Sequence, residues 1–397
     1  MQSAQADREI DTVALEAKAN PARPIAIAGV DPELGFAGGE TQVLGLTLAL
    51  AAAGQRAELI CDPAGRLCER ARAAGIKCHP LRIRNAIDIG AAMRLRTILY
   101  REHFDVVHFH TSRAHSMAPF VRAYAPATIV TRRMDYRPNR LFAPYLFNRA
   151  VDRVIAISHG VADSLSAAGV DRERITTILS GVDCERFRPP DAKQRERARA
   201  SLGLRADEIA IVAVGALEAR KGHRYLIEAA AALAQTAASS TAPLRYFIAG
   251  AGSIRDELER EIAQLGCVQR VTMLGRIDDP LELLWASDIF VMPSLKEGLG
   301  VAALEAMSCG VAVIASAVGG LAEVVENDRT GIQVEPARPD QIASAIARLA
   351  KSLELRTRLG ATARARVEQN YSMAAMAART LALYRECLNQ SRGEKKV

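Results

Sequence analysis

Short runs of apolar, often β-branched residues alternate along the chain with longer segments in which apolar positions recur at helical spacing. Strands that are apolar almost throughout are typical of parallel sheets covered by helices on both faces. Their alternation with helices predicts right-handed crossovers and doubly wound α/β sheets. The expected strands are residues 24–30, 57–62, 105–110, 128–133, 153–158, 209–215, 244–250, 270–274, 289–294 and 311–316.

A domain boundary is expected at Pro189-Pro190, within a charged stretch that has no strand character. We predict an N-terminal domain over residues 23–190 and a C-terminal domain over residues 191–370. The last segment, 371–397, is predicted as a helix that could cross back to the first domain. Doubly wound sheets bind ligands at the carboxyl ends of their strands. Two Rossmann-like domains in tandem would therefore face each other across a cleft, the first holding an acceptor and the second a donor.

The composition is that of a soluble globular protein. The chain has 397 residues, of which 49% are hydrophobic and 24% charged. No apolar run reaches the roughly 18 residues that span a bilayer. Residues 1–22 are polar and lack the apolar core of a signal peptide, so we expect a disordered arm there and a cytoplasmic protein.

The cysteines are scattered and none belongs to a CxxC pair. Metal centres and disulfide frameworks have tighter, paired spacing. We therefore expect reduced thiols in the interior of a cytosolic protein. The seven positions are Cys61, Cys68, Cys78, Cys184, Cys267, Cys309 and Cys387.

The positive charge is concentrated between Arg82 and Arg149. This segment holds twelve Arg, no Lys and four acids, which gives 12 − 4 = +8, whereas the whole chain carries +7. A basic surface attracts phosphates, nucleic acid or an anionic membrane; ordinary solvated helix faces are the alternative. Nucleic acid is the weaker partner, because no basic-aromatic interleaving or finger motif accompanies the charge.

The strongest chemical signal follows the expected strand at 289–294 and has the sequence KEGLGVAALE at 296–305. Its two glycines let the backbone approach a ligand, and the free N–H groups of the following helix can bind a diphosphate. Glu297 lies in the loop and Glu305 about two turns into the helix, so we expect the carboxylates at different depths of one pocket. Carboxylates suit sugar and ribose hydroxyls as acceptors. The alternative is two solvated acids.

This motif resembles that of the retaining glycosyltransferases of family 4, which have the GT-B fold. Glu297 and Glu305 match the family's E-x7-E pattern, and the resemblance covers almost the whole chain after the first twenty or so residues. It includes ASAVGGLAE at 315–323, Thr330-Gly331 and SGVD at 180–183.

The resemblance implies transfer of a hexose from a nucleotide-sugar, most often a UDP-sugar, with retention and without a metal or other cofactor. It implies that the acceptor hydroxyl attacks beside the leaving phosphate, so that no enzymatic nucleophile is needed. Glu305 would bind the ribose and Glu297 the transferred sugar. The backbone N–H groups of Gly298, Leu299, Gly300 and Val301 would line the same pocket.

A second loop, GALEARKG at 215–222, follows the strand at 209–215. In the family, a Lys and often an Arg directly after the first Gly bind the donor phosphates. Lys221 fits the first of these roles, but Ala216 occupies the Arg position, and Arg220 could substitute for it. Two such cations would neutralise the leaving diphosphate, which otherwise needs a metal.

The first domain offers a smaller set of candidates. Gly38-Gly39 can expose backbone N–H groups to phosphate and resembles the family's first-domain glycine loop. His110, at the end of its strand, matches the histidine that the family holds close to the reacting sugar. We expect strand alternation to point His108 and His110 to opposite faces. The candidate acceptor contacts are Glu40, Arg132 and Arg133.

Two other site types are rejected. His115 lies close to His110 in sequence, but no ordered set of Cys, Asp or Glu accompanies it, so no metal site is expected. Gly250-Ala251-Gly252 resembles a dinucleotide fingerprint that lacks its third glycine, because Arg255 stands there. A tight turn is expected instead of an NAD site.

The expected activity is therefore hexose transfer to a glycan or lipid-linked acceptor, at the inner membrane face and in lipopolysaccharide or exopolysaccharide assembly. A UDP-sugar epimerase of the same fold is the rival among enzymes. An inactive sugar-nucleotide binding protein is the rival outside them, and Ala216 is the feature that favours it.

Overall fold

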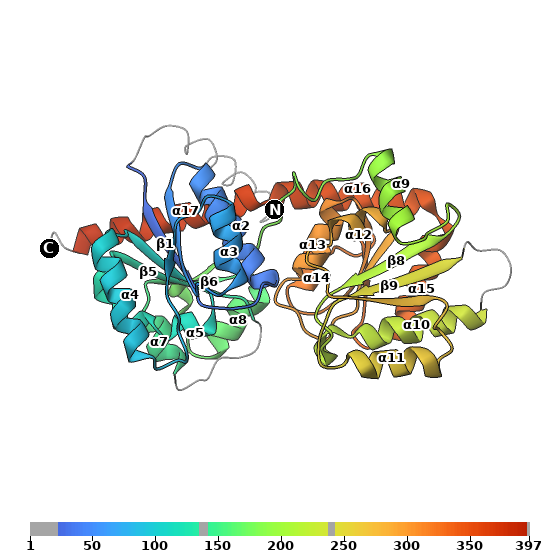
Figure 1. Cartoon of the computed structure of the whole chain (residues 1–397), viewed down its shortest axis with the longest axis horizontal. Helices are drawn as coiled ribbons and strands as arrows, with labels where there is room; N and C mark the ends of the chain where they lie inside the picture. The colour runs from blue at the N-terminus through green and yellow to red at the C-terminus, as the bar shows by residue number, and fades with distance from the viewer. Residues whose placement is uncertain (1–22, 135–141, 237–242, 395–397) are drawn as a thin grey trace.

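The computed structural model describes residues 23–134, 142–236 and 243–394; the arm predicted at 1–22 lies outside the described residues. Two α/β domains lie side by side, each with a parallel sheet between layers of helices (Figure 1). This is the GT-B architecture that the sequence predicted.

The first sheet has seven parallel strands in the order β3-β2-β1-β4-β5-β6-β7. Its strands are β1 (Ala26–Asp31), β2 (Arg56–Cys61), β3 (Cys78–Pro80), β4 (Val106–Phe109), β5 (Ala127–Arg132), β6 (Arg153–Ala156) and β7 (Ile175–Thr177). Its helices are α2 (Gly38–Ala52), α3 (Arg66–Ala73), α4 (Ile89–Glu102), α5 (Ser112–His115), α6 (Ala118–Val121), α7 (Ala143–Arg149) and α8 (His159–Ala167), with 3-10 turns η1 (Arg122–Tyr124) and η2 (Arg172–Arg174).

The second sheet has six parallel strands in the order β10-β9-β8-β11-β12-β13. Its strands are β8 (Ile209–Val214), β9 (Leu244–Ala249), β10 (Val271–Gly275), β11 (Ile289–Met292), β12 (Ala312–Ser316) and β13 (Ile332–Val334). Its helices are α9 (Ala192–Ser201), α10 (His223–Thr236), α11 (Arg255–Gln264), α12 (Leu281–Ala286), α13 (Val301–Ser308), α14 (Leu321–Val324), α15 (Pro339–Lys351) and α16 (Leu353–Asn370), with the 3-10 turn η3 (Ala219–Lys221).

All ten predicted strands are present. The three that the sequence did not predict, β3, β7 and β13, are edge strands of three residues each. Such short segments carry too few positions for alternation to be recognised. The strand order reverses between β1 and β4, and again between β8 and β11, and these two switch points are where doubly wound sheets bind ligands.

The C-terminal helices run along one side of both domains (Figure 1). Helix α16 packs against α13 and β12, whereas α17 (Met373–Glu394) packs against α2 and β5 of the first domain. The chain crosses from the second domain back to the first between α16 and α17. At this point the N–H of Val182 donates to the carbonyl of Tyr371 (2.7 Å), and the N–H of Met373 donates to the carbonyl of Val182 (2.9 Å). Gly181 permits this crossing, because a Cβ there would lie 2.8 Å from the Cα of Met373.

None of the helices in the described part of the chain combines the length and the apolar character that crossing a bilayer requires.

Candidate active site

The two domains meet at Gly298, in the loop that follows β11. A Cβ on Gly298 would overlap the backbone carbonyl oxygen of Arg133, which directly follows β5. A Cβ on Gly320 would in turn overlap the carbonyl oxygen of Gly298. The glycines that the sequence singled out therefore permit close backbone contact between the domains, and they bring the loop of Glu297 to the first-domain candidates.

Glu297 is held by two partners within the second domain. The Nζ of Lys221 forms an ion pair with its Oε1, and the Oγ of Ser294 donates to the same oxygen at 2.9 Å. Both charged side chains are largely buried. The chain segments of Lys221 and Glu297 are joined directly, since the N–H of Leu295 donates to the carbonyl of Arg220 (2.7 Å).

The turn before α10 depends on Gly222, whose φ is +66°. A Cβ at this position would overlap the carbonyl oxygen of Pro293, so the loop after β8 packs tightly on the loop after β11. This contact places Lys221 over the end of β11. The Gly222 contact was not predicted, because it depends on the pairing of β8 with β11. Ser294 was not predicted either, although it lies only three residues before Glu297.

Arg220 does not stand free to replace the missing family arginine. Its Nε donates to the carboxylate of Glu218 at 2.7 Å. Ala216 offers no charge at the family's Arg position. In this conformation Lys221 is therefore the cation that lies directly at Glu297.

Glu305 lies on α13, which begins at Val301 after Gly300 in the left-handed conformation (φ +93°). It is the fifth helical residue, just over one turn from the start rather than the two turns expected, because a turn takes 3.6 residues. Burial raises the pKa of the Glu305 carboxyl to about 7; Arg186 opposes the shift and Asp279 adds to it. Glu305 and Glu297 thus have different electrostatic surroundings.

The two strand histidines of the first domain lie together. Their ring centroids are 4.0 Å apart, so the expectation that they point to opposite faces was wrong. Residues two apart in a strand share a face, since the side-chain period is two. Burial holds the pKa values of both well below the usual range, and nearby Arg133 adds to this, so both imidazoles are neutral.

His108 is fixed by two hydroxyl groups. Its Nδ1 lies 2.7 Å from the hydroxyl of Tyr384 on α17, and its Nε2 lies 2.6 Å from the Oγ1 of Thr131. His110 differs, because among the described residues its buried Nδ1 has no hydrogen-bond partner. His108 therefore supports the position of His110.

A charge cluster lies at the ends of β1 and β5. Burial raises the pKa of Asp31 to about 7 and lowers that of Arg133 to about 10. Each group stabilises the charge of the other. The charge of Glu40 favours the protonated form of both, which raises both pKa values. Asp31 was not predicted, although its place at the end of β1 was a usable signal. The buried Nε of Arg133 has no hydrogen-bond partner within the described ranges.

The other first-domain candidates lie around this cluster. Gly38 and Gly39 begin α2, and the carboxylate of Glu40 accepts the N–H of Ala37 at 2.7 Å, so it caps its own helix. A Cβ on Gly39 would lie 4.0 Å from the Cδ of Arg133. Arg132 is buried and donates to the Oγ of Ser112 (3.3 Å).

Glu323, in the glycine-containing motif of the second domain, bonds directly to the first domain. Its carboxylate accepts the backbone N–H groups of His159 (3.2 Å) and Gly160 (3.1 Å) at the start of α8. It also lies 2.8 Å from the Nδ1 of His159. A second link between the domains is the two-point ion pair of Arg66 with Asp278 (2.9 and 2.7 Å).

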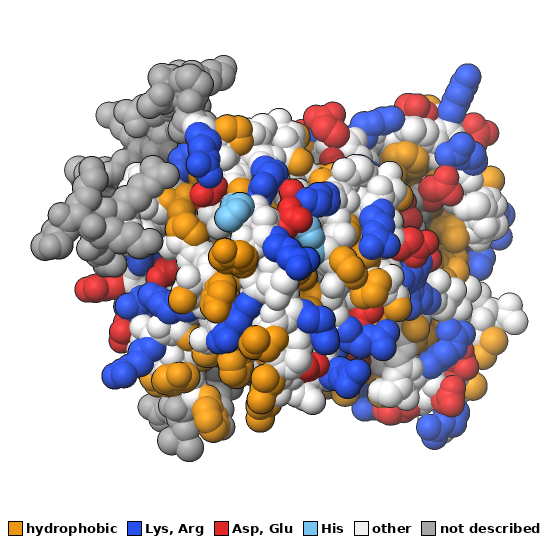
Figure 2. All heavy atoms as spheres, turned by 60° about the vertical axis from the view of Figure 1, so that its left-hand side comes forward, with side chains coloured by type: hydrophobic (Ala, Val, Ile, Leu, Met, Phe, Trp, Pro, Cys, Tyr) orange, Lys and Arg blue, Asp and Glu red, His pale blue; other side chains and the backbone are white. Residues whose placement is uncertain are grey.

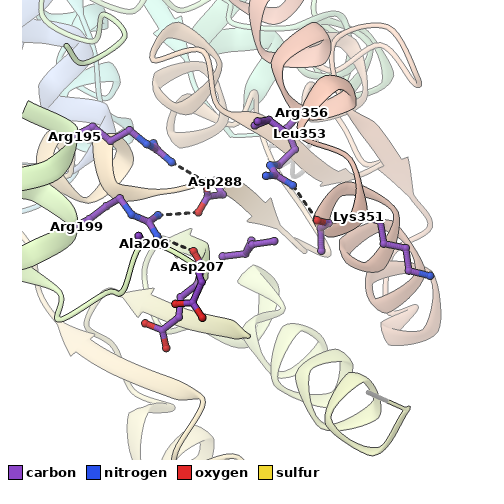
Figure 3. Close-up of a pocket in the computed structure, with 11 residues that line it drawn as sticks. Arg195, Arg199, Ala206, Asp207, Asp288, Lys351, Leu353 and Arg356 are labelled. Carbon is purple, nitrogen blue, oxygen red and sulfur yellow. Dashed lines mark hydrogen bonds and ion pairs between the residues drawn. The ribbon is translucent and has the colours of Figure 1, made fainter. Parts of the chain in front are cut away.

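A separate cavity of about 360 Å³ lies between α9, the start of β8 and the junction of α15 with α16 (Figure 3). Its arginines are already bonded to protein. Arg195 and Arg199 both bind the carboxylate of Asp288, at 2.7 and 3.0 Å, and Arg356 donates to the carbonyl of Ala350 (3.1 Å). The contacts of Arg195 and Arg199 attach α9 to the segment that precedes β11.

Two family models match the chain. The model described as Glycosyltransferase Family 4 matches residues 36–186, and the model described as Glycosyl transferases group 1 matches residues 194–366. The chain belongs to the group 1 glycosyltransferases. The matched segments coincide with the two domains and include the predicted site residues of each.

Curated relatives match in part. An uncharacterized glycosyltransferase of Methanocaldococcus jannaschii is 32% identical over 245 residues, covering 61% of this chain and 62% of that protein. The D-inositol 3-phosphate glycosyltransferase of Rhodococcus erythropolis is 36% identical over 206 residues, covering 49% of this chain and 45% of that protein. The chain thus spans about half to two thirds of the length of these relatives.

Two solved structures show the same fold over nearly the whole chain. A glycosyltransferase of Rickettsia africae superposes with a TM-score of 0.81 at 22% identity, covering 92% of this chain and 99% of that one. The Anabaena protein HepE, in complex with UDP and glucose, gives a TM-score of 0.80 at 20% identity, covering 90% and 99%.

Proposed function

We propose that the chain transfers a hexose from a nucleotide-sugar, with UDP as the nucleotide, to an acceptor hydroxyl with retention of configuration. The observation that carries the proposal is the ion pair of Lys221 and Glu297 at the end of β11, next to the Gly298 contact with the first domain. A cation and a carboxylate held together there can serve the diphosphate and the sugar of one donor.

The donor proposal draws on a neighbour of the same fold. HepE has been solved with UDP and with UDP-glucose. In this chain the start of α13 offers backbone N–H groups to a diphosphate, and Glu305 on the same helix offers a carboxylate to the ribose. Lys221 would exchange part of its contact with Glu297 for the phosphate oxygens.

The chemical step needs groups that stabilise charge and position the sugar. Lys221 and the N–H groups of α13 would stabilise the leaving diphosphate, so that no metal is required. Glu297 would accept a sugar hydroxyl. The neutral His110, at the end of β4, would bind another hydroxyl of the hexose. The leaving phosphate would take the proton of the attacking acceptor hydroxyl.

The acceptor is proposed to be phosphorylated or lipid-linked, as in lipopolysaccharide or exopolysaccharide assembly. Arg133 supports a phosphate, because its Nε is buried and without a partner among the described residues, beside the switch point of the first sheet. An Arg fork suits phosphate oxygens. Several curated relatives are D-inositol 3-phosphate glycosyltransferases, whose name indicates a phosphorylated acceptor.

A peripheral attachment to anionic membrane through α4 is also proposed, on narrower grounds than the Arg-rich segment suggested. Several arginines of the segment from Arg82 to Arg149 form ion pairs within the domain. Their partners include Asp62, Glu33 and Asp152. The guanidinium of Arg96 is also engaged within the domain, because it donates to the carbonyl of Phe120 at 2.6 Å.

The exposed face of α4 is a stripe that combines apolar and basic side chains. Ile89, Met93 and Tyr100 are 64%, 54% and 72% exposed and share one face of α4, with the exposed Arg94 and Arg101 beside them. Leu95 and Leu99, on the other face of the same helix, are buried. On this side of the molecule, hydrophobic and basic atoms lie intermixed at the surface (Figure 2).

The proposal is tested by incubating the protein with a panel of UDP-sugars, with and without phosphorylated acceptors, in the presence of EDTA. Acceptor-dependent release of UDP, absent from the Glu297→Gln variant, is the expected result. Interconversion of the donor without acceptor would favour an epimerase. UDP-sugar binding without any turnover would identify a binding protein, and activity that returns only with added divalent metal would contradict the metal-independent mechanism.

A further inference from the structure

Three cysteines from different elements meet at the outer edge of the first sheet. Cys61 ends β2, Cys78 begins β3, and Cys68 lies in the first turn of α3. Their Sγ atoms all lie within 4.8 Å of one another. The sequence did not predict that these three would meet, because spacings of seven and ten residues match no local motif.

The register of the strands explains the meeting. Leu59 pairs with Cys78, and Cys61 with Pro80, in the parallel ladder of β2 and β3. Paired residues and residues two apart share a face, so Cys61 and Cys78 point to the same side of the sheet. Helix α3 covers that side and brings Cys68 into the same apolar layer, together with Val43, Leu67, Ala71 and Ile76.

The geometry fits three sulfur ligands around one ion. Metal–thiolate bonds are about 2.3 Å long, so three sulfurs in a plane around an ion lie about 4 Å apart. The group contains no His, Asp or Glu among the described residues. Soft thiolates select Cu⁺ and Zn²⁺, and structural zinc takes four ligands. A three-sulfur set within an apolar layer therefore favours Cu⁺.

Access is consistent with metal binding. Cys61 and Cys68 are buried, whereas Cys78 is half-buried and opens the group to solvent. Cys78 is thus the first ligand that an entering ion would meet. Each thiol that binds releases its proton to solvent, and the ion keeps its oxidation state.

We infer that Cys61, Cys68 and Cys78 form a binding site for one thiophilic metal ion, with Cu⁺ preferred over Zn²⁺. The site is separate from the proposed transferase chemistry. It would connect α3 with β2 and β3, and thereby stabilise the edge of the sheet. Helix α3 starts against the loop that leads to α2, where the N–H of Arg66 donates to the carbonyl of Leu34 at 3.2 Å.

A second group of possible ligands nearby carries no such inference. Glu58, His79 and Glu102 lie together in the same part of the first domain. Their carboxylates already bind cations of the protein, since Lys77 pairs with both acids and Arg56 with Glu58. This group is an internal ion network.

The experiment uses the full chain, reduced and kept without oxygen. Cu⁺ is titrated in competition with a bathocuproine chelator, and the thiolate-to-copper absorption is followed. We expect one Cu⁺ per chain, a raised melting temperature, and an affinity at least about tenfold lower in Cys78→Ala. Cys184→Ala is the matched control, because Cys184 is also half-buried but lies outside the group. It should bind as the wild type does.

Circular dichroism establishes that each variant is folded, and Cys78→Ser provides a variant of closer size. Equal copper binding by Cys78→Ala and Cys184→Ala would overturn the site. So would a wild-type chain that cannot take copper from the chelator. A parallel titration with Zn²⁺ tests the ion: one Zn²⁺ per chain without Cu⁺ binding would overturn the preference for copper.

Discussion

The hydroxyl of Tyr384 on the last helix lies 2.7 Å from the Nδ1 of His108 in the first sheet, although the two residues are 276 positions apart. Both side chains are fully buried, and the His108 ring lies directly against that of His110. The C-terminal helix therefore completes the support of the histidine that is proposed to contact the sugar.

Tyr384→Phe removes this hydrogen bond and leaves a buried imidazole nitrogen unpaired. We expect the free energy of unfolding to fall by about 1–3 kcal/mol, because an unsatisfied buried polar group loses its solvation without compensation. Denaturant unfolding measures the change. Tyr100→Phe, at an exposed position of α4, is the matched control and should have little effect. A similar stability for both variants would contradict the role of the pair.

The two glutamates of the donor site are predicted to act differently on UDP. Glu305→Ala should weaken UDP binding, because the ribose is present in UDP itself. Glu297→Ala should leave UDP binding nearly unchanged and lower turnover, since its proposed partner is the transferred sugar. Calorimetry with UDP and turnover with UDP-sugar measure the two effects. An equal loss of UDP affinity in both variants would refute the assignment.

The raised pKa of Glu305 predicts a pH dependence. A carboxylate of pKa about 7 is mostly protonated at pH 6 and mostly ionised at pH 8. Only the ionised form can accept two ribose hydroxyls fully, so UDP affinity should rise about tenfold over this range. In Glu305→Gln, UDP affinity should keep only the pH dependence that the phosphates of UDP cause. Calorimetry at several pH values compares this variant with the wild type.

The Glu305 carboxyl also affects the free energy of unfolding, and its raised pKa determines the direction of this effect. The folded-state pKa lies above the ordinary value of 4.5, so the folded chain keeps this proton to higher pH than the unfolded chain. The contribution to the free energy of unfolding is complete below about pH 4.5 and is lost as the pH rises to about 7. A Glu305→Gln variant with an unchanged pH slope in this window would contradict the shift.

Much of the fold follows from short-range pattern. The ten apolar strands were predictable because most are buried on both faces, as in β1 and β11. The loops of Glu297 and Lys221 were predictable because each directly follows such a strand. Their ion pair was not, because it depends on β8 lying beside β11, a neighbour relation that the strand order in space decides.

Other features of the site depend on contacts between distant segments. Tyr384 reaches His108 only because α17 returns to the first domain. Asp31 acquires its raised pKa from burial that a single strand does not reveal. The error at His108 and His110 is of a different kind: the sequence contained the answer, since positions two apart in a strand share a face.

The contacts of Glu323 with His159 and Gly160 predict a conformational effect. Removing this carboxylate loses three of the polar contacts between the domains, while the ion pair of Arg66 with Asp278 remains. Glu323→Ala should therefore populate a more open arrangement, with a larger scattering radius before UDP-sugar is added and closure on binding. Glu354→Ala, at an exposed acid of α16, is the control. A radius equal to that of wild type would count against the contact.

The last prediction concerns the apolar and basic stripe of α4. Each basic residue near an anionic membrane contributes about 1 kcal/mol, so Arg94→Gln with Arg101→Gln should weaken binding to anionic vesicles about thirtyfold. Tyr100→Ser should weaken binding through lost apolar contact, with less dependence on salt. Co-sedimentation with anionic and neutral vesicles at low and high salt measures both effects.

The control places the same loss of charge elsewhere, because any removal of positive charge lowers attraction to an anionic surface somewhat. Lys193→Gln with Arg260→Gln removes two exposed cations from the second domain. If α4 faces the membrane, this control should bind almost as the wild type does. An equal loss in both double variants would show that net charge alone drives the attraction. Equal binding of the wild type to neutral and anionic vesicles would remove the basic residues from any membrane role, and the arginines of α4 would then be an ordinary solvated helix face.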